Sequence, residues 1–191
     1  MTEYEAFAVE LARAAAAVTL PLFRGDHGEV NKAKRGDFDP VTQADRGAEA
    51  VMRDLISARY PDHGIIGEEY GADRPDAEHV WVLDPVDGTR AFVAGLPVWT
   101  TLIALRSAGQ PAVGVIAQPY LYELYLGGPS GAVMTGRGQT LPIKVRACPR
   151  LNDAVIATTD PDIFNGAEAG AWTQVRAAAR LARLGCDAYA Y

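Results

Sequence analysis

Two aspartates flank a proline at the end of a short apolar segment, an arrangement that could hold a divalent cation. Val80–Leu83 is apolar and favours a strand, and Asp84 follows at its carboxyl end, where open α/β sheets tend to bind ligands. Pro85 has a fixed φ and no N–H group, so we expect it to stop the strand and bend the chain. The bend would place Asp84 and Asp87 on one side with the Val86 carbonyl between them. Asp-Pro and Asp-Gly are also ordinary turn formers, so this segment alone leaves a surface turn open.

The next two residues, Gly88 and Thr89, could bind a phosphate. Glycine lets the backbone approach a ligand closely. If a helix begins near Thr89, its unpaired N–H groups and its dipole would favour an anion there. Donors for a phosphate would then lie beside carboxylates for a hard cation.

Two further acidic segments lie upstream. Gly67-Glu68-Glu69 follows an apolar pair, which again places carboxylates just after an expected strand. Asp39–Asp45 carries a hydroxyl and two carboxylates around a predicted helix start, with Thr42 as the N-cap. Taken alone, these segments favour a solvated glutamate pair and a simple helix cap.

Together, the three segments would bring four carboxylates near one another: Glu68, Asp84, Asp87 and Asp45. Such crowding of negative charge is unfavourable without cations. The combination therefore predicts a metal site.

The ordered set of motifs resembles the inositol monophosphatase superfamily of Mg-dependent, lithium-sensitive phosphatases. The resemblance rests on Asp39–Asp45, Gly67–Glu69 and Trp81–Phe92, and it runs over essentially the whole chain. It implies an α+β, layered αβαβα sugar-phosphatase fold of the inositol monophosphatase and fructose-1,6-bisphosphatase type. The implied activity is hydrolysis of a small phosphate monoester, and family members commonly form homodimers.

Three other segments are most similar to the histidinol-phosphate phosphatase branch of this superfamily. They are Arg90–Leu105, Gly114–Pro119 and Gly185–Tyr191. The expected substrate is therefore L-histidinol phosphate, an intermediate of histidine biosynthesis. Inositol 1-phosphate or a related sugar phosphate is the alternative.

The resemblance also implies roles for individual residues. The ligands of Mg²⁺, which prefers oxygen, would be Glu68, Asp84, the carbonyl of Val86 and Asp87. The catalytic residues would be Asp45, Thr89 and Glu68, with Thr89 oriented by Asp45 to position the attacking water. The substrate would be bound by Asp87, Gly88, Thr89, Gly185 and Asp187. Glu69 would be either a neighbour of the ligands or a solvated side chain.

One departure from the family concerns a further metal-binding aspartate, which the family takes from a Trp-Asp motif near its C-terminus. Trp81, Trp99 and Trp172 are all followed by Val or Thr. We therefore expect the chain to be C-terminally incomplete. Residues 1–141 would form an N-terminal α+β metal-binding domain, and residues 142–191 would begin a C-terminal α/β domain. If the chain truly ends at Tyr191, an impaired metal- or phosphate-binding module is the alternative.

Composition narrows the class of protein further. The 191 residues are 49% hydrophobic and carry a net charge of −6, which argues against a nucleic-acid partner. The N-terminus is acidic and no apolar run approaches 18 residues, so we expect neither export nor membrane insertion. Cys148 and Cys186 lack a metal-type spacing, which favours reduced thiols and a cytoplasmic location.

Periodicity predicts the remaining elements. Tyr4–Phe23 has a helical apolar stripe that ends near Pro21. An antiparallel meander is expected from four strands: Thr100–Leu105, Ala112–Gln118, Glu123–Leu126 and Ala132–Met134. A strand at Ala154–Thr158 and a helix at Ala167–Arg183 would follow. Between the first two helices lies a basic loop with Lys32, Lys34 and Arg35, which in the family is a mobile segment near the site and is otherwise a solvated loop.

Overall fold

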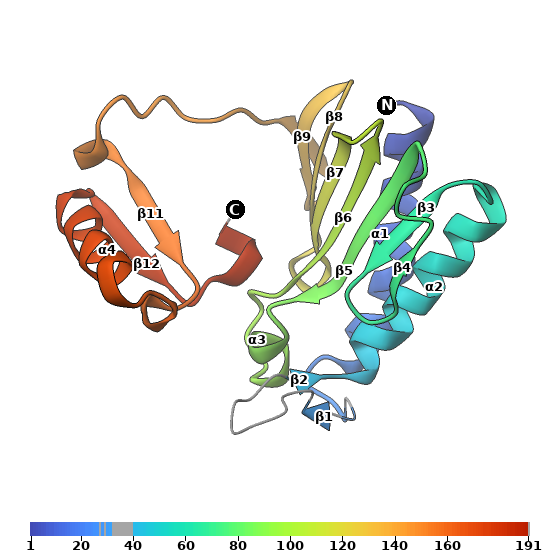
Figure 1. Ribbon diagram of the computed structural model, residues 1–191, viewed down its shortest axis with the longest axis horizontal. Coiled ribbons are helices and arrows are strands. Elements are labelled where there is room, and N and C mark those ends of the chain that lie inside the picture. The colour runs from blue at the N-terminus through green and yellow to red at the C-terminus, as the bar shows by residue number, and fades with distance from the viewer. Residues whose placement is uncertain (27, 29, 32–39, 191) are drawn as a thin grey trace.

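The structure of the protein is a computed structural model (Figure 1) that describes residues 1–26, 28, 30–31 and 40–190. Asp39 and the basic residues Lys32, Lys34 and Arg35 lie outside the described residues, so the predictions made for them stay predictions.

Two long helices lie side by side on one face of a large sheet (Figure 1). Helix α1 (Glu3–Leu22) begins at Thr2 with a capping box closed by Glu5, and it continues through Pro21 to its last residue. Helix α2 (Gln43–Arg59) begins after Thr42, as predicted, and Asp45 closes a second capping box there. Each helix buries one apolar stripe against the sheet.

The sheet has eight strands in the order β10-β9-β8-β7-β6-β5-β3-β4. Their bounds are β3 Gly64–Gly67, β4 Gly71–Asp73, β5 His79–Asp87, β6 Thr100–Ser107, β7 Gln110–Gln118, β8 Glu123–Gly128, β9 Gly131–Gly136 and β10 Gln139–Pro142. Strands β3 and β5 are parallel, whereas every other neighbouring pair is antiparallel. The predicted meander is therefore confirmed. A separate two-stranded sheet pairs β1 (Val30–Asn31) with β2 (Pro40–Val41).

The main core lies between the two helices and the sheet. It joins helix residues such as Phe7 and Met52 to strand residues such as Trp81 and Leu105, all fully or almost fully buried. A second cluster packs around Val86 at the carboxyl end of β5. Its buried members are Phe23, Ala44, Val86, Phe92 and Trp99. This second cluster supports the segment in which the acidic motif lies.

The prediction that Pro85 stops the strand is wrong. Strand β5 continues to Asp87, and its register against β6 shifts between Asp84 and Asp87. Pro85 has no N–H group, and it lies where the register shifts, so the pairing of β5 with β6 requires no hydrogen bond from its nitrogen. The Pro85 carbonyl accepts a hydrogen bond of 2.7 Å from the Thr101 hydroxyl instead.

The C-terminal part follows an extended segment, residues 143–150. It pairs β11 (Val155–Thr158) with β12 (Leu181–Leu184) in parallel, joined by α4 (Gly166–Ala178). The predicted helix over Ala167–Arg183 is therefore too long, because parallel pairing with β11 requires the chain to leave the helix and return as a strand. Short 3₁₀ turns cover Leu151–Asp153, Pro161–Ile163 and Asp187–Ala190. The division of the chain after residue 141 stays a prediction.

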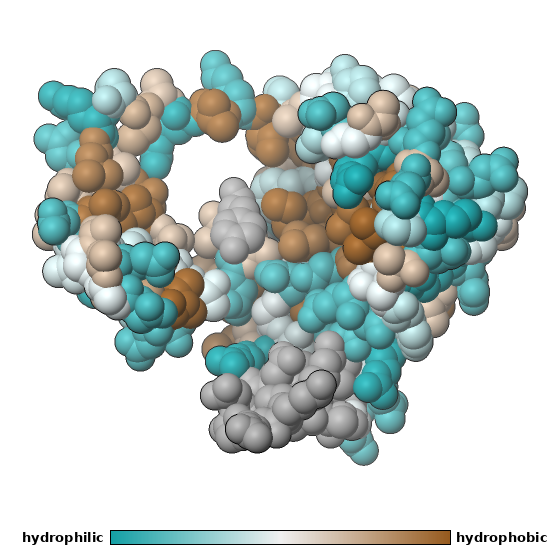
Figure 2. All heavy atoms as spheres, in the orientation of Figure 1, coloured by the Kyte–Doolittle hydropathy of each residue, from teal (hydrophilic) through white to brown (hydrophobic). Residues whose placement is uncertain are grey.

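The sheet face turned toward this C-terminal part carries apolar side chains. Figure 2 shows them gathered in the hollow between the two parts, and a cavity of about 570 Å³ is lined there by residues that include Val82, Leu102 and Ile116. Among the residues that the structure describes, none of the helices combines the length and the apolar character that a membrane crossing requires.

Candidate active site

The acidic residues of two parallel strands meet at one edge of the sheet. Strands β3 and β5 run in register with Gly67 opposite Leu83, so Glu68 and Asp84 follow at neighbouring positions. Burial, the charges of Glu68 and Asp87, and a hydrogen bond with Glu68 raise the pKa of Asp84 to about 8. Asp45 adds to the same shift. Three of the carboxylates predicted to lie together therefore crowd around Asp84.

Asp87 ends strand β5 and faces the C-terminal part of the chain. Burial raises its pKa, a hydrogen bond from the Ala188 N–H opposes this, and the charges of Asp187 and Glu68 add to the increase. The Ala188 bond measures 2.9 Å and ends on Oδ2 of Asp87.

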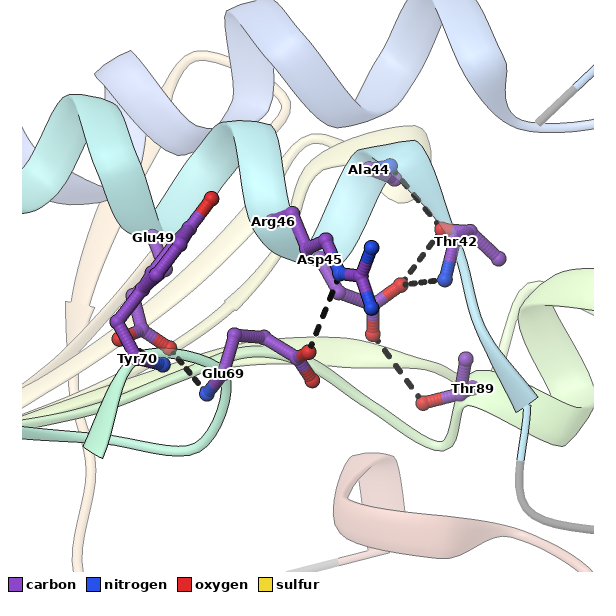
Figure 3. A network of polar contacts seen from close by, with 8 residues as sticks. All are labelled: Thr42, Ala44, Asp45, Arg46, Glu49, Glu69, Tyr70 and Thr89. Atoms are coloured by element: carbon purple, nitrogen blue, oxygen red, sulfur yellow. Dashed lines mark hydrogen bonds and ion pairs between the residues drawn. The ribbon is translucent and has the colours of Figure 1, made fainter. Parts of the chain in front are cut away.

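Asp45 connects the start of α2 to the residue after the acidic motif. Its Oδ2 accepts hydrogen bonds from the Thr42 N–H at 2.8 Å and from the Thr42 hydroxyl at 2.6 Å. Its Oδ1 faces the Thr89 hydroxyl at 3.3 Å (Figure 3). Asp45 is 2% exposed, so packing and capping hold its carboxylate toward Thr89.

Thr89 is the first residue of the short helix α3 (Thr89–Val93), so the condition stated for a phosphate site, a helix start near Thr89, is met. Its hydroxyl also lies 3.1 Å from the Val86 carbonyl, to which it can donate. Gly88 precedes it with φ of 85°, a left-handed conformation that favours glycine. This turn carries the main chain from the last strand residue into the helix.

The turn that contains Asp187 packs against the same place. A Cβ atom on Gly88 would lie 3.0 Å from Oδ2 of Asp187, so a side chain at this position would press on Asp187. The Gly185 N–H donates to the carbonyls of Thr158 and Thr159 at 3.1 and 2.9 Å. The structure thus brings Asp187 to the acidic motif, while Gly185 holds the turn to strand β11.

Glu69 is a neighbour of the site that solvent does not reach. Its side chain is 3% exposed and lies 3.9 Å from the Arg46 guanidinium. Its N–H donates a 2.7 Å hydrogen bond to Glu49 (Figure 3). The alternative of a solvated Glu69 is therefore excluded.

Sequence reasoning missed Glu49, which is fully buried on α2. A glutamate one helical turn after Asp45, on the same side of the helix that begins at Thr42, is the pattern that could have identified it. Buried carboxylates need partners, and those of Glu49 come from the loop that carries Glu68 and Glu69.

The donor set is suited to a hard cation. Asp84 Oδ1 is buried without a hydrogen-bond partner, and the nearby oxygens come from carboxylates, the ligand type that Mg²⁺ prefers. Within the described residues, no three or more His, Cys, Asp or Glu side chains are arranged to hold a metal ion as they stand. Glu68 and Asp84 share a hydrogen bond. Carboxylates suited to a cation are thus present around Asp84.

Comparisons with known proteins agree with this arrangement. All of residues 1–191 match the inositol monophosphatase family. The chain is 40% identical over 198 aligned positions to the chloroplastic bifunctional phosphatase of Arabidopsis thaliana, with 100% of this chain and 55% of that protein covered. It is 39% identical to the histidinol-phosphatase of Chlorobaculum parvum, with 85% of this chain and 61% of that protein covered.

A solved inositol monophosphatase from Zymomonas mobilis has the same fold. It superposes with a TM-score of 0.82 and 38% identity over 100% of this chain and 73% of that one. The chain spans a little more than half the length of the two curated relatives. On the match to the whole chain and on these similarities, the protein belongs to the inositol monophosphatase family.

Proposed function

We propose that this protein hydrolyses a small phosphate monoester with the help of Mg²⁺, and that its substrate is L-histidinol phosphate. Its family consists of small phosphate-ester phosphatases that are generally metal-dependent. The observation that carries the proposal is the half-buried Asp84 carboxyl, which has one buried oxygen without a partner and the charges of Glu68 and Asp87 beside it. A cation would relieve this repulsion.

The residues proposed to hold Mg²⁺ are Glu68, Asp84, the Val86 carbonyl and Asp87. Bound there, the metal would polarise the phosphoryl oxygens and lower the pKa of a water molecule. The two parallel strands position Glu68 and Asp84, and the irregular end of β5 positions Asp87.

Thr89 and Asp45 form the proposed water-positioning pair. The Thr89 hydroxyl lies within hydrogen-bond distance of Asp45 Oδ1. A hydroxyl that donates to a carboxylate keeps its lone pairs free to accept from a water. Thr89 can therefore orient the attacking water while Asp45 holds the hydroxyl in place.

The substrate is proposed to lie beside the Gly88 turn and the Asp187 turn, which contact each other. The N–H groups of Gly88 and Thr89 would bind phosphate oxygens, and Asp187 would face the remainder of the ester. An acidic side chain here favours a cationic leaving group over a neutral polyol, which supports histidinol phosphate. The similarity to a histidinol-phosphatase over 85% of this chain supports the same choice.

Inositol 1-phosphate is the second candidate substrate. Its support is the Zymomonas mobilis inositol monophosphatase, which is 38% identical over the whole of this chain. The cytoplasmic location and the homodimer belong to the proposal as well, and gel filtration with light scattering tests the dimer.

The direct test is release of inorganic phosphate by the purified protein, with L-histidinol phosphate and inositol 1-phosphate compared at equal concentrations with and without Mg²⁺. We expect Mg²⁺-dependent release with a preference for histidinol phosphate, and its loss in Asp87→Asn. Activity retained by Asp87→Asn would refute the assigned site. Release from neither substrate, with Mg²⁺ still bound, would indicate the alternative of an impaired metal- or phosphate-binding module.

A further inference from the structure

The Glu49 side chain binds the loop that follows strand β3. Glu49 is 0% exposed, and its Oε2 accepts a 2.7 Å hydrogen bond from the Glu69 N–H. Its Oε1 accepts from the Tyr70 N–H at 3.1 Å and from Arg53 Nε at 2.8 Å. A buried carboxylate thus has charge-assisted bonds on both oxygens.

Helix α2 contacts the loop at both of its ends. A Cβ atom on Gly67 would overlap the Glu49 carboxylate, so the close approach requires glycine at that position. At the other end of the loop, the Arg53 guanidinium donates to the Gly71 carbonyl. Glu68 lies between these two attachments.

The same face of helix α2 also contacts Thr89, on the other side of the acidic motif. Asp45, Glu49 and Arg53 are spaced four residues apart and therefore project from one side of the helix. Asp45 holds Thr89, one helical turn from the point where Glu49 holds the loop. Four residues of helix rise about 6 Å, so one side of α2 contacts both the loop that carries Glu68 and the residue Thr89.

We propose that Glu49 is a positioning residue, which acts through the backbone N–H groups of Glu69 and Tyr70 to keep Glu68 beside Asp84. The inference rests on the proposed function, in which Glu68 and Asp84 together hold the cation. Groups that orient metal ligands typically change metal affinity or activity by about 10- to 100-fold when they are removed. Glu49 fits this role through main-chain contacts.

The main variant for the test is Glu49→Gln, which keeps the shape of the side chain but replaces one acceptor oxygen with an amide that cannot accept. The first readout is amide hydrogen exchange of the purified protein without metal. We expect exchange at Glu69 and Tyr70 to rise about tenfold, with the strands β6 and β7 unchanged. The matched control is Glu10→Gln on α1, whose exposed carboxylate pairs with Arg59, and it should leave both amides unchanged.

The second readout is Mg²⁺ affinity by calorimetry, followed by turnover at saturating Mg²⁺. Glu49→Gln should weaken Mg²⁺ binding at least tenfold. Raising the Mg²⁺ concentration should restore much of the turnover of this variant, and the KM for the ester should change little. Faster exchange at the two amides with unchanged Mg²⁺ affinity would overturn the proposal, because Glu49 would then serve stability alone. Unchanged exchange would overturn it as well.

Two further measurements cover the cases in which Glu49→Gln does not fold or the unmodified protein binds no Mg²⁺. If Glu49→Gln does not fold by circular dichroism, Arg53→Met tests the same attachment of the loop, because it removes one partner of Glu49 and the hydrogen bond to the Gly71 carbonyl but leaves both amide bonds to Glu49. It should shift exchange and Mg²⁺ affinity in the same direction by a smaller factor, and no shift in either would overturn the inference. If the unmodified protein binds no Mg²⁺ at all, the proposed function fails, and this result is recognised independently of the variants.

Discussion

The backbone N–H of Ala188 donates a hydrogen bond of 2.9 Å to Oδ2 of Asp87, across 101 residues of sequence. The neighbouring Tyr189 hydroxyl donates to Glu123 Oε2 at 2.8 Å on strand β8. Ala188 itself is 1% exposed. The hydrogen bonds of Ala188 and Tyr189 thus hold the turn Asp187–Ala190 against the end of the acidic motif.

Tyr189→Phe should loosen this turn. The change removes the hydroxyl that donates to Glu123, so the Ala188 amide should exchange about five- to tenfold faster, as expected for loss of one hydrogen bond. Tyr125→Phe is the matched control, since the Tyr125 hydroxyl donates to the same Glu123 oxygen at 3.1 Å without touching the turn. Equal effects of the two variants on the Ala188 amide would contradict this role for Tyr189.

Thr89→Ala should slow turnover by about 100-fold while changing Mg²⁺ affinity less than threefold, because the hydroxyl is proposed to orient water. Thr89→Ser keeps a hydroxyl within reach of Asp45 and should recover most of the rate. The measurements are steady-state kinetics at saturating Mg²⁺ and calorimetric titration of the metal. A larger loss in Mg²⁺ affinity than in kcat would rule out water positioning.

Asp84→Asn should make the metal-free protein more stable at neutral pH and abolish its response to Mg²⁺. Asparagine keeps the shape of the side chain and removes a carboxyl group whose charged form is disfavoured by burial and by Glu68 and Asp87. We expect a gain of about 1–3 kcal/mol in the free energy of unfolding without metal. Thermal unfolding with and without Mg²⁺ checks this, and an Mg²⁺-induced rise in Tm that survives in the variant would count against Asp84 as a ligand.

Glu5→Gln should remove a pH-dependent part of the stability. Burial alone would raise the pKa of Glu5, but hydrogen bonds from Ser130 and Thr2 outweigh it and lower the pKa to about 2. The folded state therefore favours the charged form, and its contribution is present above the ordinary pKa of 4.5 and is lost as the pH falls through about 2.

The variant should lower the free energy of unfolding by about 1–3 kcal/mol at pH 7, and the gap to the unmodified protein should narrow as the pH falls below 4.5. Urea unfolding at pH 7, 4 and 3 measures this gap. A gap that stays constant over this range would show that Glu5 does not act through its charge.

Much of the fold could be predicted because it depends on residues close in the sequence. Thr42 caps α2 through its own side chain and that of Asp45, three residues away. The meander strands are short alternating or apolar segments separated by Gly and Pro turns, and each pairs with its neighbour in the chain. The acidic motifs could be found for the same reason, since each is a short run of neighbouring residues at the end of a strand or the start of a helix.

The errors arose where pairing between distant segments decided the local structure. Pro85 locally predicts a strand end, yet the register shift against β6 lets β5 continue past it. Residues 179–183 have the composition of the helix before them, yet Leu181–Leu184 pairs with β11 as a parallel strand. Backbone hydrogen bonds to a distant partner outweigh helix propensity, which differs by less than about 1 kcal/mol per residue among ordinary residues.

The sequence by itself determined which residues could hold a cation and a phosphate, because side-chain chemistry and its order along the chain are local properties. Only the tertiary structure decided which residues hold them in place. Glu49 meets the Glu69 amide across 20 residues, and Ala188 meets Asp87 across 101. No periodicity along the chain specifies such contacts, since they exist only after the helices pack on the sheet and the buried carboxylates take the partners that packing supplies.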